Sequence, residues 1–546
     1  YNGLGFVLGT IIAYLFFRRI SLTLLAVIGP MVAILWTLGV VGGLDYRLNL
    51  FINVITPLIL VSGFSDSMHL VFAIRRDIMA GVDRLTAARE AVLDVAPACL
   101  LTAMNAVLAL LSFSFAESAL IRTFGMVAIM AVAISYIAVA VVVPTLAALL
   151  IPREKTPVKD VAPNQDGGFG VLGAITEWIV RRVIAAPLAF SLAGLFAVLL
   201  TGAAYVQLVP QYRLADQVPD KEHALAATDR LDQKLPGANP VHVMIRWNGG
   251  QSLFEDKTLA AIAAAHTVLE KEAGLGNVWS VESLRRWLAE AGDASIETVK
   301  KYISILPEHL VQRFITNEQN AVLVTGRLPD IDASEILPIV EKIDRALEPV
   351  RTTHAGYEIS VTGLPAIAAR NSARLIGELN WGLIGDMFVI FIFLGIALRS
   401  VLSGVTSILP SLFPIFATGT VLWIGGEGLQ FASIVAITVA FALAIDNTIH
   451  FLNRFQLEEN RPGTRDVNDA LVRTMHHIGP VIVLTTIVLA LGLGVTILSH
   501  LPSLRLFGRL AGICLFASLI GQLIILPATV ALYRRHWPRR TPAAAA

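Results

Sequence analysis

The sequence GFSDSMH at residues 63–69 lies inside an apolar stretch that runs from residue 50 to residue 73. A second stretch of the same kind, residues 429–452, contains the sequence AIDNTIH at residues 444–450. A helix needs about 20 predominantly apolar residues to cross a bilayer, and each stretch is long enough. Acidic side chains are costly inside such a helix and usually face a bundle interior or a water-filled path. The two stretches therefore predict membrane-spanning helices that carry a functional polar centre.

Nine further apolar stretches accompany these two. They are residues 3–17, 22–42, 96–115, 124–150, 184–206, 377–398, 401–424, 479–498 and 505–533. Charged residues make up only 15% of the 546-residue chain, against about 25% in soluble proteins. We therefore expect an α-helical polytopic membrane protein with eleven spans present. The net charge of +1 gives no reason to expect a nucleic-acid partner.

The two polar sequences belong to an internal repeat. At an offset of 383 residues Pro97 recurs as Pro480, Thr102 as Thr485, Phe124-Gly125 as Phe507-Gly508 and Pro144 as Pro527. Upstream the offset falls to 381 and then to 380. Five helices in each half run in the same direction, which is a parallel repeat of the transporter kind. By symmetry we expect a further helix and a first periplasmic domain before Tyr1, which gives twelve spans in the intact protein; the alternative is that eleven spans are complete.

Basic residues indicate the orientation, because they collect in cytoplasmic loops. One side of the predicted bundle holds Arg18, Arg19, Arg75, Arg76, Arg84, Arg153, Lys155, Lys159, Arg181, Arg182, Arg399, Arg454, Arg461, Arg473, Arg534, Arg535, Arg539 and Arg540. The opposite side holds Asp45, Glu117, Glu427 and a block of soluble composition at residues 207–375. We therefore expect a bacterial inner-membrane protein with this large block in the periplasm.

The block at residues 207–375 is predicted to be α/β. Strands are expected at His242–Trp247, Ala321–Arg327 and Tyr357–Thr362, the last ending in the turn Gly363-Leu364-Pro365, and helices at Lys257–Lys271 and Ser334–Leu347. This alternation suggests a small sheet with helices on one face.

The predicted organisation has six parts. They are a first transmembrane half (residues 1–150), a cytoplasmic linker with an amphipathic helix (151–183), the first helix of the second half (184–206), the periplasmic domain (207–375), the second transmembrane half (376–535) and a cytoplasmic tail (536–546). Within the linker part, residues 152–168 are rich in Pro, Gly and charge and are expected to be flexible. Residues 169–182 are expected on the cytoplasmic membrane face.

Helical spacing places Asp66 with His69 on one face of the first polar helix, and Asp446 with His450 on one face of the second. A carboxyl group removed from water holds its proton to higher pH, so it can load a proton from one side and release it to the other. Imidazole titrates near neutrality and can relay that proton or pair with the acid. A structural hydrogen bond for the acids, and a capping or interface role for the histidines, are the competing interpretations.

Aligned in the repeat, Ser65 corresponds to Asp446 and Asp66 to Asn447, so each half supplies one acid. The predicted proton relay comprises Asp66, Asp446, Asn447, His69 and His450. Supporting polar residues that can hydrogen-bond the acids or hold water are Ser65, Thr102, Asn105, Thr485 and Thr486, although Ser and Thr are also common packing residues between membrane helices. Asp386, within the seventh span, is a candidate for the substrate path, with a structural role as the alternative.

The sequence predicts no cofactor other than the proton gradient. Cys99 and Cys514 lie in apolar runs and are expected to be small packing residues. No Cys, His and carboxylate cluster has metal-ligand spacing, and no phosphate-binding loop of the Gly-rich Lys-Ser/Thr type occurs. The soluble block also contains no nucleophile–base constellation, so an enzyme is not expected.

The repeat, the extracytoplasmic block and the polar fourth helix of each half resemble the resistance-nodulation-division superfamily. The three-residue spacing in Asp66/His69 and Asn447/His450, with the sequences LPGANP at 235–240 and VTGLP at 361–365, resembles its lipid-exporting branch, related to Patched and Niemann–Pick type C proteins. That resemblance implies proton relay by Asp66 and Asp446, although relatives often carry an acidic pair in one helix. It also implies a lipid substrate such as a sterol or hopanoid, a periplasmic lipid-binding partner and a homodimer or monomer.

Energetics limits how such a lipid can travel. One proton crossing the membrane releases about 2.3 kcal/mol per 100 mV, whereas exposing each methylene to water costs about 0.8 kcal/mol. An apolar tunnel or groove in the periplasmic domains is therefore expected. The alternatives are a drug or heavy-metal efflux pump, a Patched-like lipid sensor without transport, and an accessory to protein secretion.

Overall fold

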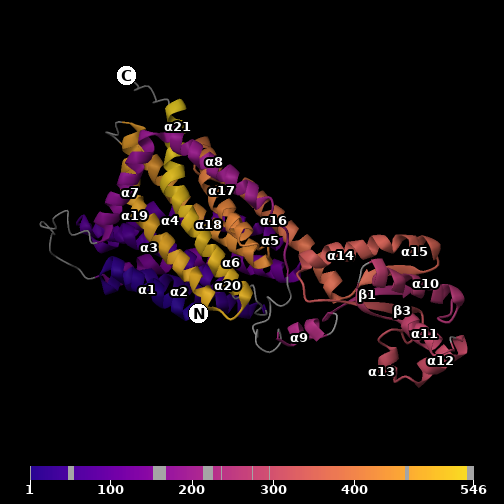
Figure 1. Cartoon of the computed structure of the whole chain (residues 1–546). Helices are drawn as coiled ribbons and strands as arrows, with labels where there is room; N and C mark the ends of the chain where they lie inside the picture. Colours follow the sequence, from indigo (N-terminus) through magenta and orange to yellow (C-terminus); the bar gives the residue numbers. More distant parts are fainter. Residues whose placement is uncertain are drawn as a thin grey trace. The chain divides into compact units, whose positions relative to one another are not determined.

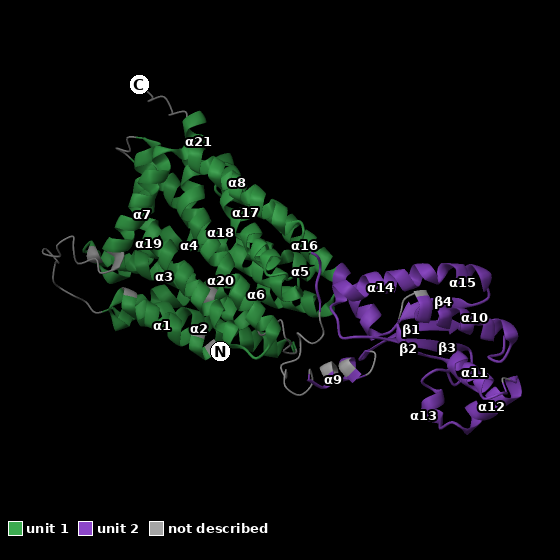
Figure 2. Ribbon diagram, viewed as in Figure 1, with its two compact units in different colours: residues 1–208, 375–546 green, residues 209–374 purple. Residues whose placement is uncertain are grey.

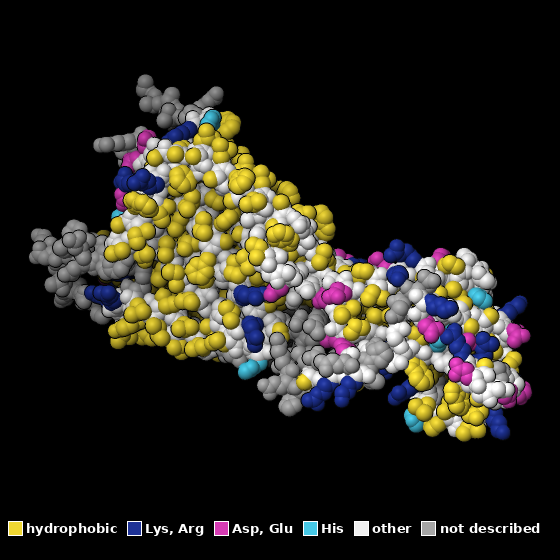
Figure 3. All heavy atoms as spheres, in the orientation of Figure 1, with side chains coloured by type: hydrophobic (Ala, Val, Ile, Leu, Met, Phe, Trp, Pro, Cys, Tyr) yellow, Lys and Arg dark blue, Asp and Glu magenta, His cyan; other side chains and the backbone are white. Residues whose placement is uncertain are grey.

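The computed structural model describes residues 2–46, 54–151, 168–212, 226–234, 237–272, 275–293, 295–461 and 466–537. They fall into two compact units, residues 1–208 with 375–546 and residues 209–374 (Figure 2). Residues 152–167 of the predicted linker and residues 538–546 of the predicted tail lie outside the described residues. Figure 3 shows hydrophobic side chains over most of the visible face of the first unit.

The first unit is helical (Figure 1). Its helices are α1 (Asn2–Phe17), α2 (Ile20–Gly43), α3 (Ile55–Met79), α4 (Arg84–Ala109), α5 (Leu111–Ser114), α6 (Ala119–Leu150), α7 (Gly168–Ala185), α8 (Pro187–Tyr205), α16 (Leu364–Ala397), α17 (Val401–Ile424), α18 (Phe431–Glu459), α19 (Val467–Gly494), η6 (Val495–Leu498), α20 (Pro502–Ile520), η7 (Gly521–Ile525) and α21 (Leu526–His536). Among the described residues, ten helices are long and apolar enough to cross a membrane, and α1 adds a shorter apolar helix. The expected polytopic helical fold is confirmed, with ten such helices among the described residues where eleven spans were predicted; the predicted span at 3–17 is the shorter helix α1.

Two helices, α3 and α18, form the centre of the first unit. In each, 94% of the most apolar window is buried, against 28% for α8 and 33% for α16. Helix α3 packs against α2, α4, α6 and α19, and α18 packs against α4, α17, α19 and α20. A helix covered on all sides cannot present charge to lipid or bulk water, so any acid on it must be accommodated by the protein.

The two halves repeat each other in detail. Helices α2 and α17 each contain an internal proline, Pro30 and Pro410. The turn before each of these helices contains an arginine with positive φ, 50° at Arg18 and 47° at Arg399. The backbone conformation of this turn therefore recurs at positions that the sequence repeat pairs.

The repeated glycines Gly125 and Gly508 mark the same close approach in each half. A Cβ atom added to Gly125 would lie 2.7 Å from the backbone N of Ser114. One added to Gly508 would lie 3.0 Å from the backbone N of Ile497. In both halves a long helix crosses the short helical turn that precedes it, which leaves no room for a side chain.

Substitution of Gly508 by alanine should lower the free energy of unfolding by about 1–3 kcal/mol, because the new methyl group overpacks this crossing. The measurement is the midpoint of thermal unfolding in detergent. Gly512→Ala on the same helix is the control, since its added Cβ meets nothing closer than 4.0 Å. The control should be neutral or stabilising by up to about 1 kcal/mol, because alanine favours the helix. Equal midpoints for the two variants would contradict the close approach.

The second unit contains a four-stranded antiparallel sheet with strand order β2-β3-β1-β4. Its elements are α9 (Ala226–Lys234), β1 (Asn239–Arg246), α10 (Asp256–Thr267), η5 (Val268–Glu272), β2 (Gly276–Trp279), α11 (Val281–Glu290), α12 (Ile296–Ile305), α13 (Glu308–Val311), β3 (Ala321–Leu328), α14 (Ala333–Ala346), α15 (Glu348–Thr353) and β4 (Glu358–Thr362). Strand β1 alternates, with Val241, Val243 and Ile245 fully buried. These residues share one core with Ile262 of α10 and Val340 of α14, so helices cover that face of the sheet.

Two local predictions need correction. Strand β2 was not expected, because its four residues are too few to show alternation. The sequence Gly363-Leu364-Pro365 is not only a turn: Gly363 has φ +111° and α16 begins at Leu364, well before the predicted span at 377. Proline is favoured in the first turn of a helix, so this sequence starts a helix immediately after the turn.

Candidate functional site

The four titratable residues of the predicted relay lie on the two central helices. Asp66 and His69 are on α3, and Asp446 and His450 are on α18, with 6–9% of each residue exposed. The imidazole rings of His69 and His450 stack on each other, with centroids 3.8 Å apart and planes 15° from parallel. The two halves of the repeat therefore meet directly at this pair.

Pairing of a histidine with an acid was one of the roles considered for these rings, and the structure shows another contact as well. No hydrogen bond in the described part of the chain joins His69 to Asp66 or His450 to Asp446. Instead each ring packs on its counterpart from the other half. Spacing along one helix shows which residues share a face, but it cannot show which side chain of another helix fills that face.

Equivalent polar contacts surround Asp66 and its repeat partner Asn447. Thr102 Oγ1 lies 2.8 Å from the Cys99 carbonyl oxygen, to which it donates, and 3.4 Å from Asp66 Oδ1. Thr485 Oγ1 likewise donates to a carbonyl of its own helix at 2.9 Å and lies 3.3 Å from Asn447 Oδ1. The predicted threonines therefore do contact the relay positions.

The remaining supporting residues have different environments. Thr486 Oγ1 lies 3.5 Å from Asn447 Nδ2, which donates to it. Ser65 is buried on α3, with 3% of the residue exposed. Asp386, which was predicted as a candidate for the substrate path and not as a supporting residue, belongs to a separate contact, in which Ser112 of α5 donates to Asp386 Oδ2 at 2.5 Å. Asp386 thus links α16 to the first half.

Two carboxamides bond to the backbone of α18 just before Asp446. Asn105 Nδ2 of α4 donates to the Ala442 carbonyl at 3.2 Å, and Gln522 Nε2 of η7 donates to the Ala444 carbonyl at 2.5 Å. Gln522 was not singled out from the sequence, because one amide in an apolar run carries no pattern. Both contacts hold the segment that presents Asp446.

Several buried polar atoms at this centre have no hydrogen-bond partner. Within the described residues they include Asp446 Oδ1, Asn105 Oδ1, His69 Nε2 and His450 Nε2. An unpaired polar atom buried in protein costs about 1–3 kcal/mol. The gathering of such atoms around one pair of acids is typical of a site that exchanges a proton, water or an ion.

A third element, α4, adds Cys99 to this centre. Donor atoms of Asp66, Cys99 and His450 all lie within 4.8 Å of one another, and all three residues are buried. The sequence predicted a packing role for Cys99 and no metal-ligand cluster. Ligand spacing along the chain cannot reveal such a cluster, because its members come from three different helices and both halves.

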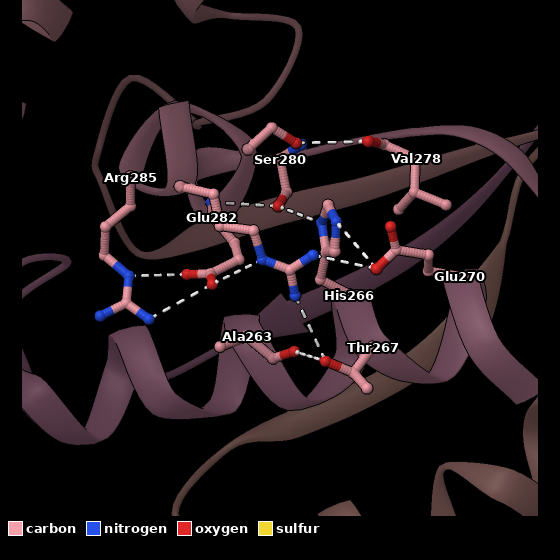
Figure 4. Close-up of polar contacts among 10 residues, drawn as sticks. Ala263, His266, Thr267, Glu270, Val278, Ser280, Glu282 and Arg285 are labelled. Carbon is pink, nitrogen blue, oxygen red and sulfur yellow. Dashed lines mark hydrogen bonds and ion pairs between the residues drawn. The ribbon is translucent and has the colours of Figure 1, made fainter. Parts of the chain in front are cut away.

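The second unit contains a different polar cluster, drawn in Figure 4. His266 Nδ1 lies 2.9 Å from Ser280 Oγ, and His266 Nε2 lies 4.0 Å from a carboxylate oxygen of Glu270. This is a serine–histidine–carboxylate set that the sequence did not reveal. Ser280 is only 7% exposed, however, and its Oγ accepts from the Glu282 backbone N at the start of α11. The serine therefore caps a helix and does not face an open cavity.

The cluster predicts that the second unit loses stability in acid. Burial, with the Arg286 guanidinium nearby, lowers the pKa of His266, so the folded state keeps the ring neutral. The unfolded chain takes up a proton below about pH 6.5, and folding therefore weakens as the pH falls below that value. The loss cannot exceed about 1.4 kcal/mol per pH unit for one group.

Hydrogen exchange of the β2 and α11 amides, corrected for the intrinsic effect of pH, measures this loss between about pH 7.5 and about pH 5.5. We expect faster exchange at the lower pH. In His266→Gln, which has no titrating ring at this position, the difference should shrink, and the remainder belongs to other groups such as His242, whose pKa burial also lowers. An unchanged difference in that variant would assign the effect to another group.

Comparisons with known proteins match both halves. A family model described as "MMPL family" matches residues 216–545. A model described as "Sterol-sensing domain of SREBP cleavage-activation" matches residues 16–164. The membrane protein MJ1562 of Methanocaldococcus jannaschii is 25% identical to this chain over 252 residues, which are 44% of this chain and 62% of that protein. The chain therefore spans less than two thirds of that relative. Its name states no activity.

Proposed function

The chain belongs to the MMPL family, a family of the resistance-nodulation-division type, and from this premise we propose that it is a proton-driven transporter of a hydrophobic lipid. The cargo is a sterol, a hopanoid or a similar lipid. It moves from the membrane through the extracytoplasmic domains towards the periplasm and the outer membrane. The residues that couple this movement to protons are Asp66 and Asp446.

One observation carries the proposal: each half of the repeat contributes one acid to a centre that is buried on all sides. An ionised carboxylate is costly in a membrane interior, whereas a protonated one is much less so. Taking up a proton at Asp66 or Asp446 therefore changes the energy of the interface between the halves. Rocking of one half against the other follows from that change.

The proposed orientation is supported by basic side chains at the ends of several helices. Arg84 Nη1 donates to the Ile151 carbonyl at 2.8 Å, and Arg535 Nη2 donates to the Ile184 carbonyl at 2.8 Å. The first contact joins an end of α4 to the end of α6, and the second joins α21 to the end of α7, so each places a basic side chain at helix ends that the sequence assigns to the cytoplasm. Since basic residues stay cytoplasmic, the opposite ends and the second unit are extracytoplasmic, in a bacterial inner membrane.

The sterol-sensing match to residues 16–164 favours lipid over other cargo. It also favours a second candidate function, a lipid sensor that binds sterol without transport. A sensor needs the lipid to shift a conformational equilibrium but needs no proton to cross the membrane.

Proton flux into liposomes that contain the protein separates these functions. Sterol, hopanoid and a hydrophobic drug are added in turn under an imposed pH gradient. Flux stimulated by sterol or hopanoid supports lipid transport. Flux stimulated only by the drug would indicate that the cargo is a drug and not a lipid. Lipid binding without any flux would support a lipid sensor.

A further inference from the structure

Cys99 has no part in the proposed proton cycle, yet it lies at its centre. It is a buried free thiol on α4, with 2% of the residue exposed. Its Sγ and donor atoms of Asp66 and His450 lie within 4.8 Å of one another. The three donors come from α4, α3 and α18, so the fold itself and not a local motif brings them together.

The three donors match the ligands that zinc prefers. Zinc binds thiolate, imidazole and carboxylate, and sites with three protein ligands leave a fourth position open. In a tetrahedral site, ligand atoms at the usual bond lengths lie roughly 3–4 Å apart. The spread of at most 4.8 Å therefore closes around an ion with a small movement of side chains. His450 Nε2, one of the two ring nitrogens able to bind an ion, has no hydrogen-bond partner within the described part of the chain.

Charge balance makes such an ion tolerable in the membrane interior. Binding removes the proton of the Cys99 thiol and any proton on Asp66, because metal ligands must be deprotonated. One divalent ion then meets one thiolate and one carboxylate, and the complex has no net charge. A neutral complex avoids most of the cost of burying an isolated ion.

We propose that Asp66, Cys99 and His450 form a binding site for a divalent transition-metal ion of the zinc type, and that the bound ion blocks proton exchange. The blocking effect rests on the proposed function, because the ion takes the carboxyl group that carries the proton and enters when that carboxyl group opens to water. Metal binding itself does not depend on transport. The ion is an inhibitor at this site and not the cargo.

Metal binding is tested on the purified protein in detergent, with Co²⁺ as the probe. Wild type should show the charge-transfer absorption of a cobalt–thiolate bond, and added Zn²⁺ should remove it. Cys99→Ser should lose the absorption. Cys514→Ser is the matched control, because Cys514 is the other buried cysteine but belongs to no such cluster among the described residues. Absorption that is absent from wild type, or that persists in Cys99→Ser, would overturn the site.

His450→Gln is the second variant and keeps the thiol. It should weaken cobalt binding at least about ten-fold, since it removes a direct ligand. Unchanged affinity in a variant that elutes as a monodisperse species would also overturn the site.

The blocking effect is tested by proton flux in liposomes with increasing Zn²⁺. With each variant's flux expressed relative to its own zinc-free flux, Cys99→Ser should require at least about ten-fold more zinc for half inhibition than wild type or Cys514→Ser. Equal zinc sensitivity would overturn the blocking role. If wild type showed no flux at all, the proposed function would fail while the cobalt measurement still decided the metal site.

Discussion

Substitution of Asp446 by asparagine should reduce proton flux in liposomes at least about 100-fold, because proton transfer by a positioned group contributes that much or more. Asparagine has nearly the shape of aspartate but cannot take up a proton. Since α18 is buried along its length, a same-sized residue should preserve the packing. Asp66→Asn should have the same effect, because each half supplies one acid.

Thr438→Val is the matched control for this result. Thr438 is a fully buried polar residue on the same helix, and its Oγ1 has no hydrogen-bond partner in the described structure. Removing that hydroxyl should leave the flux within about two-fold of wild type. If flux survived in both asparagine variants, the relay assigned to Asp66 and Asp446 would be wrong.

Substitution of Glu458 by alanine should lower the free energy of unfolding by about 3–5 kcal/mol, the usual cost of breaking a buried ion pair. Glu458 lies near the end of α18, and its side chain is 2% exposed. It lies 2.5 Å from Arg454, 3.7 Å from Arg461 and 4.0 Å from Arg473. Its loss removes the closest carboxylate from Arg454, whose side chain is 23% exposed, near the end of the helix that carries Asp446.

Asp469→Ala provides the comparison, because Asp469 bonds to the same Arg473 at 2.6 Å but its side chain is 37% exposed. An exposed pair contributes about 0–1 kcal/mol, so this variant should unfold close to wild type. The midpoint of thermal unfolding in detergent measures both. Similar midpoints for Glu458→Ala and Asp469→Ala would mean that burial of Glu458 adds nothing to stability.

The fold could be predicted from the sequence because a membrane span is a long and simple signal. The membrane spans were predicted from the length of the apolar stretches. The repeat was predicted from residues that recur at a nearly constant offset, such as Pro97 and Pro480. The strand predicted at His242–Trp247 corresponds to β1, Asn239–Arg246, in which Val241, Val243 and Ile245 are buried at alternate positions. Strand β2 is too short for the same argument.

The candidate site was predicted in part. Asp66 and Asp446 stood out because an acid in a long apolar run is unusual, whereas Cys99 and Gln522 did not, because each is a single residue with no pattern around it. The stacked histidine pair was not foreseen either. Contacts between helices that are hundreds of residues apart depend on crossing geometry, which spacing along the chain does not contain. The roles of Asp66, Asp446 and the two histidines in proton transfer remain predictions.

The central claim is that proton movement drives lipid movement, and its most direct test measures both at once. Liposomes that contain the protein and a labelled sterol or hopanoid receive a pH gradient, and loss of the lipid to an acceptor is followed with and without a proton ionophore. The account predicts release that requires the gradient, stops with the ionophore and is absent in Asp446→Asn. Release that continues at the same rate without a gradient would contradict it.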